Sequence, residues 1–518
     1  MAERRLSLQS MEKELQEVSA RDFFNHVRVT YLGKSKPNPN LEKILDKVSD
    51  QLGLSQDEVW ASQRFQLLFR ATKPKHLQLL GLDQFVEEAE AAVSAGRVMS
   101  LLPYNAVMDD STIRKYIPSR PEKFRGNWKH SMDPYGIFRA MDRVIAVDGD
   151  GNETYLATRK FPYAVLANIT EACNIGCDGC YKGSMVRTSL SALAEVYPEY
   201  AGIKKQLNLQ EQRAEKQAEL LVRWLNKNSE VDTIVISGGE PTLFSNYALQ
   251  KILDQYKQAE HVRVVRMCTS SVFQGMWYRI DDDFAEMLQN FERETDKQFY
   301  INAHVTDDHQ LSAPEARGAI DKLESVGITI HLQMPLQEGI NFRRDDLSWT
   351  EDKIRRISKL AYGLGVIPYK MIVDMHSPSH PDLTVPIETV TRVLRTLDEH
   401  THNSDHERWQ AYNVLHEQGN IYLTPHPHFT AVKEVDQDAG RVTYFIPIGN
   451  AIHTYQEPII NGHNDNPNSF GEIRDTGLND RISKVRSLFH QLNGDEDTLK
   501  KFYEESGIKL PENEPLMV

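Results

Sequence analysis

The chain alternates between short apolar runs and longer amphipathic stretches from residue 164 to residue 397. The apolar runs have the length and the β-branched content of buried strands. Six strands are predicted, at residues 164–170, 233–236, 262–267, 299–304, 329–333 and 369–373. Helices are predicted at residues 210–228, 247–256, 283–291, 313–326, 351–364 and 387–397. Strands that alternate with helices in this way predict an α/β fold with a parallel sheet and right-handed crossovers.

Six strand–helix units are fewer than the eight of a complete barrel. The pattern therefore predicts an open, partial (β/α)6 barrel of the TIM type at residues 161–402. In such barrels the functional groups lie at the carboxyl ends of the strands. The residues that directly follow each predicted strand are therefore the first candidates for a site.

The segments on either side of this barrel have a different character. Residues 1–97 have apolar positions at helical spacing and predict a helical extension that packs on the barrel or, alternatively, docks a partner. Residues 98–160 are a lead-in interrupted by prolines, with a hairpin turn predicted within residues 145–152. After a polar linker, residues 403–462 predict a small β-rich cap, and residues 463–518 form a polar tail.

Composition narrows the class of protein. The 518 residues carry a formal net charge of −14 and no dense basic run, so nucleic-acid binding has no electrostatic support. No stretch approaches 18 apolar residues, and the charged N-terminus lacks the apolar core of a secretory signal. Three of the four cysteines are clustered, which favours a reducing compartment over a disulfide framework. We therefore expect a cytoplasmic protein that binds neither membranes nor nucleic acid.

The clustered cysteines follow the first predicted strand. Cys173, Cys177 and Cys180 have the spacing C-x3-C-x2-C. Three thiolates can hold three irons of a four-iron cluster and leave the last iron open to another ligand. A closed zinc site needs four nitrogen or sulfur ligands, and no further Cys or His lies close by in the sequence. The spacing therefore predicts a [4Fe-4S] cluster.

A glycine-rich turn follows the second predicted strand. It reads Gly238, Gly239, Glu240 and Pro241. Glycines let the backbone approach a ligand closely, and the glutamate places a carboxylate where it can meet an ammonium group. Both the turn and the cysteine loop fall at the carboxyl ends of predicted parallel strands. We therefore predict that the turn binds a cofactor.

Together the two motifs resemble those of the radical S-adenosylmethionine (SAM) superfamily. The resemblance implies that SAM chelates the open iron through its amino and carboxylate groups, and that the Gly-Gly-Glu-Pro turn binds the amino group. An electron from the cluster would cleave SAM to a 5′-deoxyadenosyl radical. The resemblance also implies the open (β/α)6 barrel and a protein reductant such as flavodoxin or ferredoxin.

Shorter similarities along residues 98–461 narrow this resemblance. They include Leu102-Pro103-Tyr104, Lys160-Phe161-Pro162 and Gly339-Ile340-Asn341, together with residues 454–458. Their order and spacing resemble one branch of the superfamily, lysine 2,3-aminomutase and its relatives. That branch implies pyridoxal 5′-phosphate (PLP), which forms an imine with the substrate amine.

The sequence departs from this branch at the residues that bind PLP and substrate. Asn420 stands where the family's PLP lysine belongs, and an amide cannot form an imine. Lys182 replaces an arginine that pairs with the substrate carboxylate, and so loses the bidentate fork. Of two acidic residues that grip the substrate side chain, one falls near Asn413 and the other near Asp374. We keep these four positions as candidate substrate contacts and expect that PLP is not used.

Polar residues at the ends of later strands complete the candidate site. The predicted contacts with SAM or substrate are Asn302, His304 and Gln333. Their alternative role is as core residues whose hydrogen bonds are satisfied within the protein. Cys268 follows the third strand, where a thiol would return a hydrogen atom to a substrate radical, unless it is an inert core cysteine. His376, like Asp374, follows the sixth strand and is predicted to contact substrate.

The sequence thus predicts a radical SAM enzyme that abstracts a hydrogen atom from a small polar, amino-acid-like substrate without PLP. Isomerase, lyase and epimerase reactions all remain open. One alternative is a PLP-dependent amino acid 2,3-aminomutase with a relocated lysine, for which Lys433 is a candidate. Another is a non-catalytic, cluster-bearing maturation partner. The sequence is also compatible with a homo-oligomer.

Overall fold

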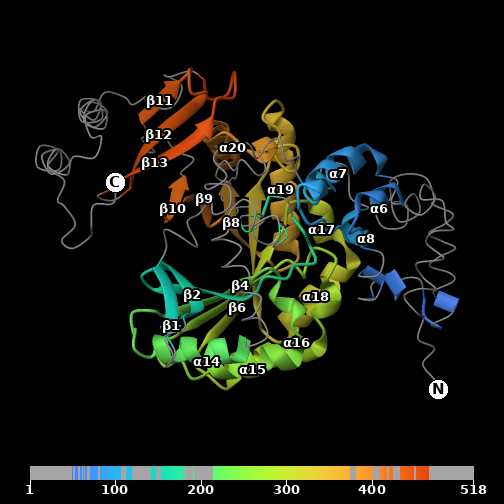
Figure 1. Ribbon diagram of the computed structural model, residues 1–518, viewed down its shortest axis with the longest axis vertical. Helices are drawn as coiled ribbons and strands as arrows, with labels where there is room; N and C mark the ends of the chain where they lie inside the picture. The colour runs from blue at the N-terminus through green and yellow to red at the C-terminus, as the bar shows by residue number, and fades with distance from the viewer. Residues whose placement is uncertain are drawn as a thin grey trace, which may run out of the picture.

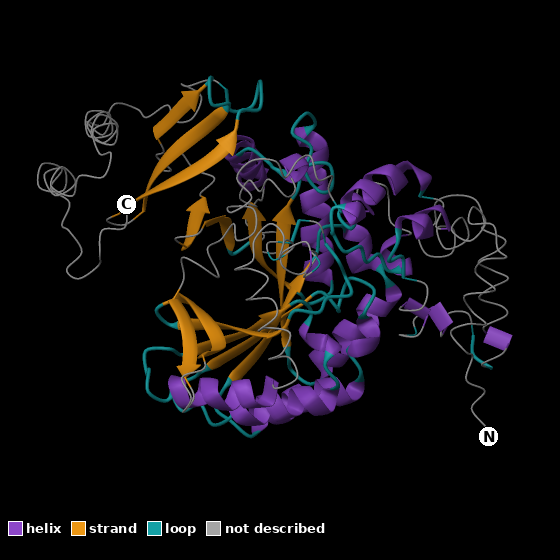
Figure 2. Cartoon of the chain, in the orientation of Figure 1, coloured by secondary structure: helices purple, strands orange, loops and turns teal. Residues whose placement is uncertain are grey.

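The structure is a computed structural model (Figure 1). It describes residues 49–50, 53–55, 59–60, 62, 65–66, 70–79, 82–106, 113–118, 142–147, 153–177, 179–180, 182, 189, 191, 214–373, 381–400, 409–416, 419–423, 432–448 and 451–465. These residues form a sheet of ten strands, a separate sheet of three strands, and helices that line the outer side of the larger sheet (Figure 2).

All six predicted strands of the barrel are present. They are β3 (Ala164–Thr170), β4 (Thr233–Gly238), β5 (Val264–Thr269), β6 (Gln298–His304), β7 (Thr329–Leu336) and β8 (Ile367–Val373). Each pairs in parallel with the next, in chain order. A hairpin of β1 (Asp142–Val147) and β2 (Glu153–Phe161) precedes them and joins β3 antiparallel. The predicted parallel α/β arrangement is therefore confirmed.

The larger sheet extends beyond the six predicted units. A seventh parallel strand, β9 (Ala411–His416), pairs with β8, and β10 (Gly419–Leu423) pairs with β9 antiparallel. Within the described chain, β1 and β10 are the edges of this sheet, so the barrel is open. The prediction missed β9 because its sequence, Ala-Tyr-Asn-Val-Leu-His, has no continuous apolar run. Residues 403–462, predicted as one cap, therefore divide between two sheets.

The helices agree in position with the predicted ones. Those that accompany the barrel strands are α14 (Ala214–Leu225), α15 (Asn246–Tyr256), α16 (Asp282–Arg293), α17 (Asp308–Ser312), α18 (Pro314–Ser325), α19 (Leu347–Gly363) and α20 (Ile387–His400). Four of them begin where a side chain accepts a backbone N–H, at Ser245, Asp281, Asp307 and Asp346. The N-terminal extension contributes α6 (Pro74–Leu79), α7 (Val86–Ser94) and α8 (Pro103–Ala106). Single turns of 3-10 helix are η1 (Asp83–Phe85), η3 (Pro241–Leu243), η4 (Trp277–Arg279) and η5 (Pro381–Leu383).

Burial along the strands separates the two faces of the barrel. Val265 and Met267 on β5 are fully buried in the hydrophobic core, which they share with residues of α15 and α16. The alternate residues of β5, among them Arg266 and Cys268, are only half-buried. Successive side chains of a strand point to opposite faces. The half-buried set therefore lines the inner side of the open barrel.

The small sheet consists of β11 (Val432–Asp436), β12 (Arg441–Ile448) and β13 (Ala451–Pro458), and it joins α20 through buried polar groups. The Tyr444 hydroxyl lies 3.0 Å from Oε1 of Glu388 and 2.8 Å from Oε1 of Glu457. Asn464 Nδ2 donates to the same Glu457 oxygen at 2.8 Å. The Tyr444 hydroxyl has one proton and can donate it to only one of the two carboxyl groups at a time. The contact with the other carboxyl group is favourable only if that carboxyl group is itself protonated. Burial accordingly raises the pKa of Glu457 to about 7.

We expect the protein to lose stability as the pH rises from about 4.5 to about 7, because of Glu457. Its folded-state pKa is raised, so the folded chain holds a proton that the unfolded chain releases. This stabilisation is complete below about pH 4.5 and disappears through about pH 7, at about 1.4 kcal/mol per pH unit. Urea unfolding across this range should show a stability that falls less steeply in Glu457→Gln than in the wild type, by about 1.4 kcal/mol per pH unit. Exposed Glu286 provides the control, and a Glu457→Gln protein that keeps the wild-type slope would refute the assignment.

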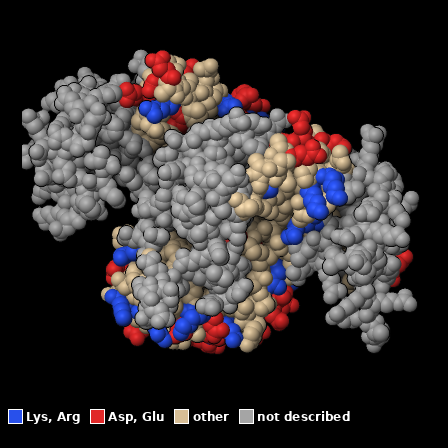
Figure 3. Space-filling model, viewed as in Figure 1, with Lys and Arg blue, Asp and Glu red and all other residues tan. Residues whose placement is uncertain are grey.

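None of the described helices is both long enough and apolar enough to cross a bilayer. On the face drawn in Figure 3, the described basic and acidic side chains are interspersed and form no continuous basic surface.

Candidate functional site

The three cysteines lie in the loop that leaves the carboxyl end of β3, and the N-terminal part of the chain holds this loop in place. Ser100 Oγ donates to the Asn174 carbonyl at 2.7 Å, and an Arg70 guanidinium nitrogen donates to Asn174 Oδ1 at 2.8 Å. Gly176 has a φ of 69°, and a Cβ there would lie 2.5 Å from the Ser100 carbonyl oxygen. The glycine is therefore required both by the backbone conformation and by this close contact.

The sulfur atoms form a donor set that suits a cluster. Cys173, Cys177 and Cys180 are all half-buried, and burial together with the nearby Cys177 raises the pKa of Cys173 to about 12. Crowded thiols of this kind are protonated unless metal ions stabilise the thiolates. The three sulfurs are not all within 4.8 Å of one another. Ligands of one tetrahedral zinc lie about 3.7 Å apart, whereas a cluster takes one thiolate per iron. The three residues fit a [4Fe-4S] cluster.

The Gly-Gly-Glu-Pro turn packs directly against the beginning of the cysteine loop. Gly239 N–H donates to the Thr170 carbonyl at 2.6 Å, and Glu240 N–H donates to the Ala172 carbonyl at 2.8 Å. A Cβ on Gly239 would lie 2.5 Å from the Ala172 carbonyl carbon. Gly238 has a φ of 139°, a region that side chains rarely adopt. These glycines therefore allow the turn to pack closely against the residues that lead into Cys173.

Glu240 connects this turn to the end of β5. Its carboxylate is buried and accepts hydrogen bonds from Thr242 N, Thr242 Oγ1, Thr269 Oγ1 and Ser270 N at 2.6 to 3.2 Å. Burial nevertheless raises the pKa of Glu240. Both carboxylate oxygens already bind groups of the protein. The side chain therefore fixes the turn, and the backbone of the turn is left to meet a ligand.

Lys182 lies between the cysteine loop and the two strand ends. Its side chain is buried, donates to Asn168 Oδ1 on β3, and lies 3.4 Å from the Gly238 carbonyl oxygen. Burial lowers the pKa of Lys182, while the neighbouring Glu171, Cys180 and Cys268 act in the opposite direction. The structure thus places this predicted substrate contact beside the predicted cluster loop and beside Cys268.

The ends of β5, β6 and β7 bring four further predicted residues together. Asn302 Nδ2 lies 3.9 Å from Cys268 Sγ, and His304 Nε2 lies 3.1 Å from Gln333 Oε1. Burial, assisted by Lys115, lowers the pKa of His304 to about 4, so its imidazole is neutral at pH 7. Burial raises the pKa of Cys268, which keeps it a thiol. The strand register accounts for both pairs, because each lies directly across from its partner.

The remaining predicted substrate residues are only partly described. Asp374 and His376 lie outside the described residues. Asn420 lies on β10, and its side chain is not described. Asn413 on β9 is fully buried, and neither atom of its amide has a hydrogen-bond partner. These four assignments stay predictions.

Sequence reasoning missed the glutamine that links the cysteine loop to β6. Gln274 Oε1 lies 3.7 Å from Cys177 Sγ and accepts from the Tyr116 hydroxyl at 3.0 Å. Its Nε2 donates to the His304 carbonyl at 2.9 Å. Gln274 follows β5 by five positions in an irregular segment, so neither spacing nor periodicity marks it.

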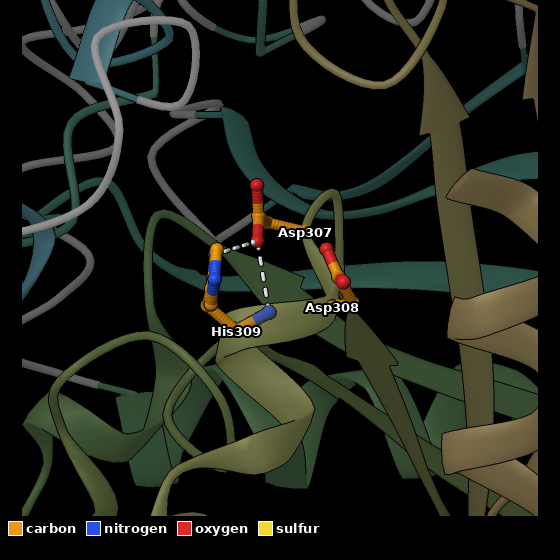
Figure 4. Close-up of side chains that lie close together, drawn as sticks. All are labelled: Asp307, Asp308 and His309. Carbon is orange, nitrogen blue, oxygen red and sulfur yellow. Dashed lines mark hydrogen bonds and ion pairs between the residues drawn. The ribbon is translucent and has the colours of Figure 1, made fainter. Parts of the chain in front are cut away.

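A separate group of Asp307, Asp308 and His309 lies at the start of α17 (Figure 4). Among the described residues, this is the only group of three whose possible metal ligands lie within 4.8 Å of one another. Lys353 contacts both carboxylates, at 3.0 Å from Asp307 Oδ2, and Arg356 lies 3.0 Å from Asp308. Cations of the protein thus already neutralise the acids. We interpret the group as a helix cap with ion pairs.

Comparisons with known proteins agree with this geometry. Residues 164–311 match the family described as a 4Fe-4S single cluster domain. A protein of Aquifex aeolicus, provisionally named an L-lysine 2,3-aminomutase, is 24% identical over 46% of this chain and 56% of its own. Glutamate 2,3-aminomutase of Clostridioides difficile is 25% identical over 36% of this chain and 37% of its own.

A third relative, L-lysine 2,3-aminomutase of Buchnera aphidicola, is 22% identical over 40% of this chain and 54% of its own. The chain therefore spans between about a third and a little over half of the length of these relatives. The matched family covers the cysteine loop, the Gly-Gly-Glu-Pro turn and the ends of β5 and β6. This match and these relatives support the resemblance to the radical SAM superfamily, and the chain is similar to members of its lysine 2,3-aminomutase branch.

Proposed function

We propose that this chain is a radical SAM enzyme that abstracts a hydrogen atom from a small polar, amino-acid-like substrate without PLP. One observation carries the proposal. The cysteine loop is hydrogen-bonded to the Gly-Gly-Glu-Pro turn at the carboxyl end of the parallel sheet, where the polar strand-end residues also converge. Cys173, Cys177 and Cys180 would hold the cluster. When bound, the cluster and SAM supply the 5′-deoxyadenosyl radical.

The residues of the chain would position the reactants. The backbone of Gly238 and Gly239 offers carbonyl oxygens to an ammonium group, with Glu240 fixing the turn. His304 is neutral and bonded to Gln333, so this pair offers uncharged hydrogen-bonding groups to SAM. Cys268 stays a thiol, and its S–H bond would break to return a hydrogen atom to a substrate carbon radical. The thiyl radical left behind would take an electron from the flavodoxin- or ferredoxin-type reductant and a proton from solvent.

The proposal that PLP is not used rests on the positions and contacts of the described lysines. Asn420 on β10 stands where the resemblance expects the PLP lysine. Lys433 lies on β11, in the separate small sheet, and Lys182 is bonded to Asn168. Among the described lysines, Lys370 favours a second candidate function, a PLP-dependent aminomutase. That residue is half-buried on β8, directly across from Gln333.

Two measurements on one anaerobic preparation would test the proposal. After reconstitution with iron and sulfide and reduction, the protein with SAM should release 5′-deoxyadenosine. After incubation with PLP and borohydride, mass spectrometry should find no lysine adduct. An adduct at Lys370 or another single lysine would establish the aminomutase alternative. A fully loaded, reduced cluster that releases no 5′-deoxyadenosine would instead favour a maturation partner without turnover.

A further inference from the structure

Within the parallel strands, the inner side of the barrel carries positive charge and no carboxylate. The seven parallel strands β3 to β9 contain no Asp or Glu within their described bounds. They contain two cations, Arg266 on β5 and Lys370 on β8. The interior of a parallel barrel is ordinarily filled with apolar branched side chains. Packing alone therefore does not explain why two cations occupy such positions.

Arg266 is half-buried and has no acidic partner among the described residues. One terminal nitrogen of its guanidinium donates to the Tyr369 hydroxyl at 3.3 Å. Its Nε is buried and has no hydrogen-bond partner. A buried donor without a partner is costly, and a buried cation without a counter-charge costs more. The guanidinium is therefore arranged to receive an anion, which none of the described residues provides.

Residues from three neighbouring strands surround Arg266. The ring of His331 lies between those of Tyr300 and Tyr369, with centroids 4.8 and 5.0 Å away. Lys370 Nζ lies 4.8 Å from the centroid of the Tyr369 ring. We call these five residues the inner cation cluster. Burial, with Arg266 nearby, lowers the pKa of His331 to about 4, so the histidine is neutral at pH 7 and leaves the two cations as the charges of the cluster.

Two buried amides on the same side of the sheet also lack partners. Asn302 Oδ1 on β6 and both amide atoms of Asn413 on β9 have no hydrogen-bond partner. Asn302 is paired across the sheet with His331, and Asn413 with Ile372 on β8. Both side chains are more than nine-tenths buried. Unpartnered polar atoms on β5, β6 and β9 thus face one region, which a polar ligand would satisfy.

We propose that the inner cation cluster binds a carboxylate at the far end of the substrate, with Arg266 as its main ligand and Lys370 as the second charge. This inference rests on the proposed function and names its substrate class: an amino acid whose side chain ends in a carboxylate. A guanidinium offers a planar pair of donors that matches a carboxylate. Arg266 precedes Cys268 by two residues, about 7 Å along the strand. A carboxylate bound there leaves the rest of the substrate at the strand ends, beside Cys268.

The test compares L-glutamate with its uncharged isostere L-glutamine and with L-lysine. Binding is measured by calorimetry on the full chain with the reconstituted cluster and SAM. We expect glutamate to bind at least about tenfold more tightly than glutamine or lysine, as a charged hydrogen-bonded contact would give. Arg266→Gln should remove that preference by weakening glutamate binding alone, and Arg266→Lys should restore part of it. Arg263→Gln, an exposed arginine three positions earlier, is the matched control and should bind as the wild type does.

Each outcome decides the proposal. Equal binding of glutamate and glutamine, tighter binding of lysine, no saturable binding of glutamate, or an unchanged preference in Arg266→Gln would each overturn it. PLP binding that depends on Arg266 would also overturn it, because the anion would then be a cofactor phosphate. Thermal unfolding of the variants verifies that they fold. Reductive SAM cleavage without any amino acid tests the proposed function separately, and the control Arg263→Gln should retain it.

Discussion

Replacing Cys177 by serine is expected to remove the cluster and to reduce reductive SAM cleavage at least about a hundredfold, since a lost thiolate leaves one iron without its ligand. Cys177 lies in the loop fixed by Ser100 and contacts Gln274, so the sulfur occupies a defined position. A serine hydroxyl is a poor ligand for iron–sulfur clusters, whose irons prefer soft thiolates. The measurements are iron content per chain, the cluster absorption and the yield of 5′-deoxyadenosine.

The matched control for this experiment is Cys268→Ser, the same chemical change at the one cysteine outside the loop. It should keep the full iron content, because the residue lies on β5 and not among the predicted ligands. If Cys177→Ser retained a complete cluster, the assignment of this thiol as a ligand would be wrong. If both variants lost iron equally, the loss would reflect general instability.

Replacing Gly239 by alanine is expected to destabilise the protein by about 3 kcal/mol and to lower its iron content, because the new methyl group has no space. The Cβ would lie 2.5 Å from the Ala172 carbonyl carbon and 3.0 Å from that of Glu171. Both are backbone atoms, so no side-chain rotation can relieve the overlap. The chain before Cys173 must shift, and the cysteine loop with it. Urea unfolding of the apo protein and iron analysis of the reconstituted protein measure the two effects.

Gly318 provides the comparison. It lies within α18, and a Cβ there would have no atom within 4 Å. Gly318→Ala should therefore stabilise the protein by about 0.5–1 kcal/mol, because alanine loses less backbone entropy in a helix. If the two alanine variants had similar stability and similar iron content, the close packing of the turn on the cysteine loop would be refuted.

The barrel could be predicted because its strands and helices are marked by local patterns. Each strand is a short apolar run, and each helix shows apolar positions at helical spacing, so both appear in the sequence without knowledge of tertiary contacts. The same logic predicted that polar residues after the strands would converge, and parallel register explains why Cys268 meets Asn302 and His304 meets Gln333. The two motifs were visible because their residues are adjacent in the sequence.

The rest depends on contacts between distant segments. Nothing near Glu240 in sequence indicates that Thr269 and Ser270 donate to its carboxylate. Arg266 was not predicted as a site residue, because an arginine within an apolar run usually indicates a solvent-facing position. It became a candidate only when the strand pairing placed it on the inner side of the barrel, next to Tyr369.

The junction between the cysteine loop and the turn also limits how this chain can be redesigned or can diverge. The hydrogen bonds from Gly239 to Thr170 and from Glu240 to Ala172 make residues 170–172 and 238–240 one structural unit, although more than sixty positions separate them. Insertions between these segments leave both ends of the unit in place, whereas a single residue added between β3 and Cys173 would break it. A graft of the cysteine motif onto another barrel must therefore carry the turn with it.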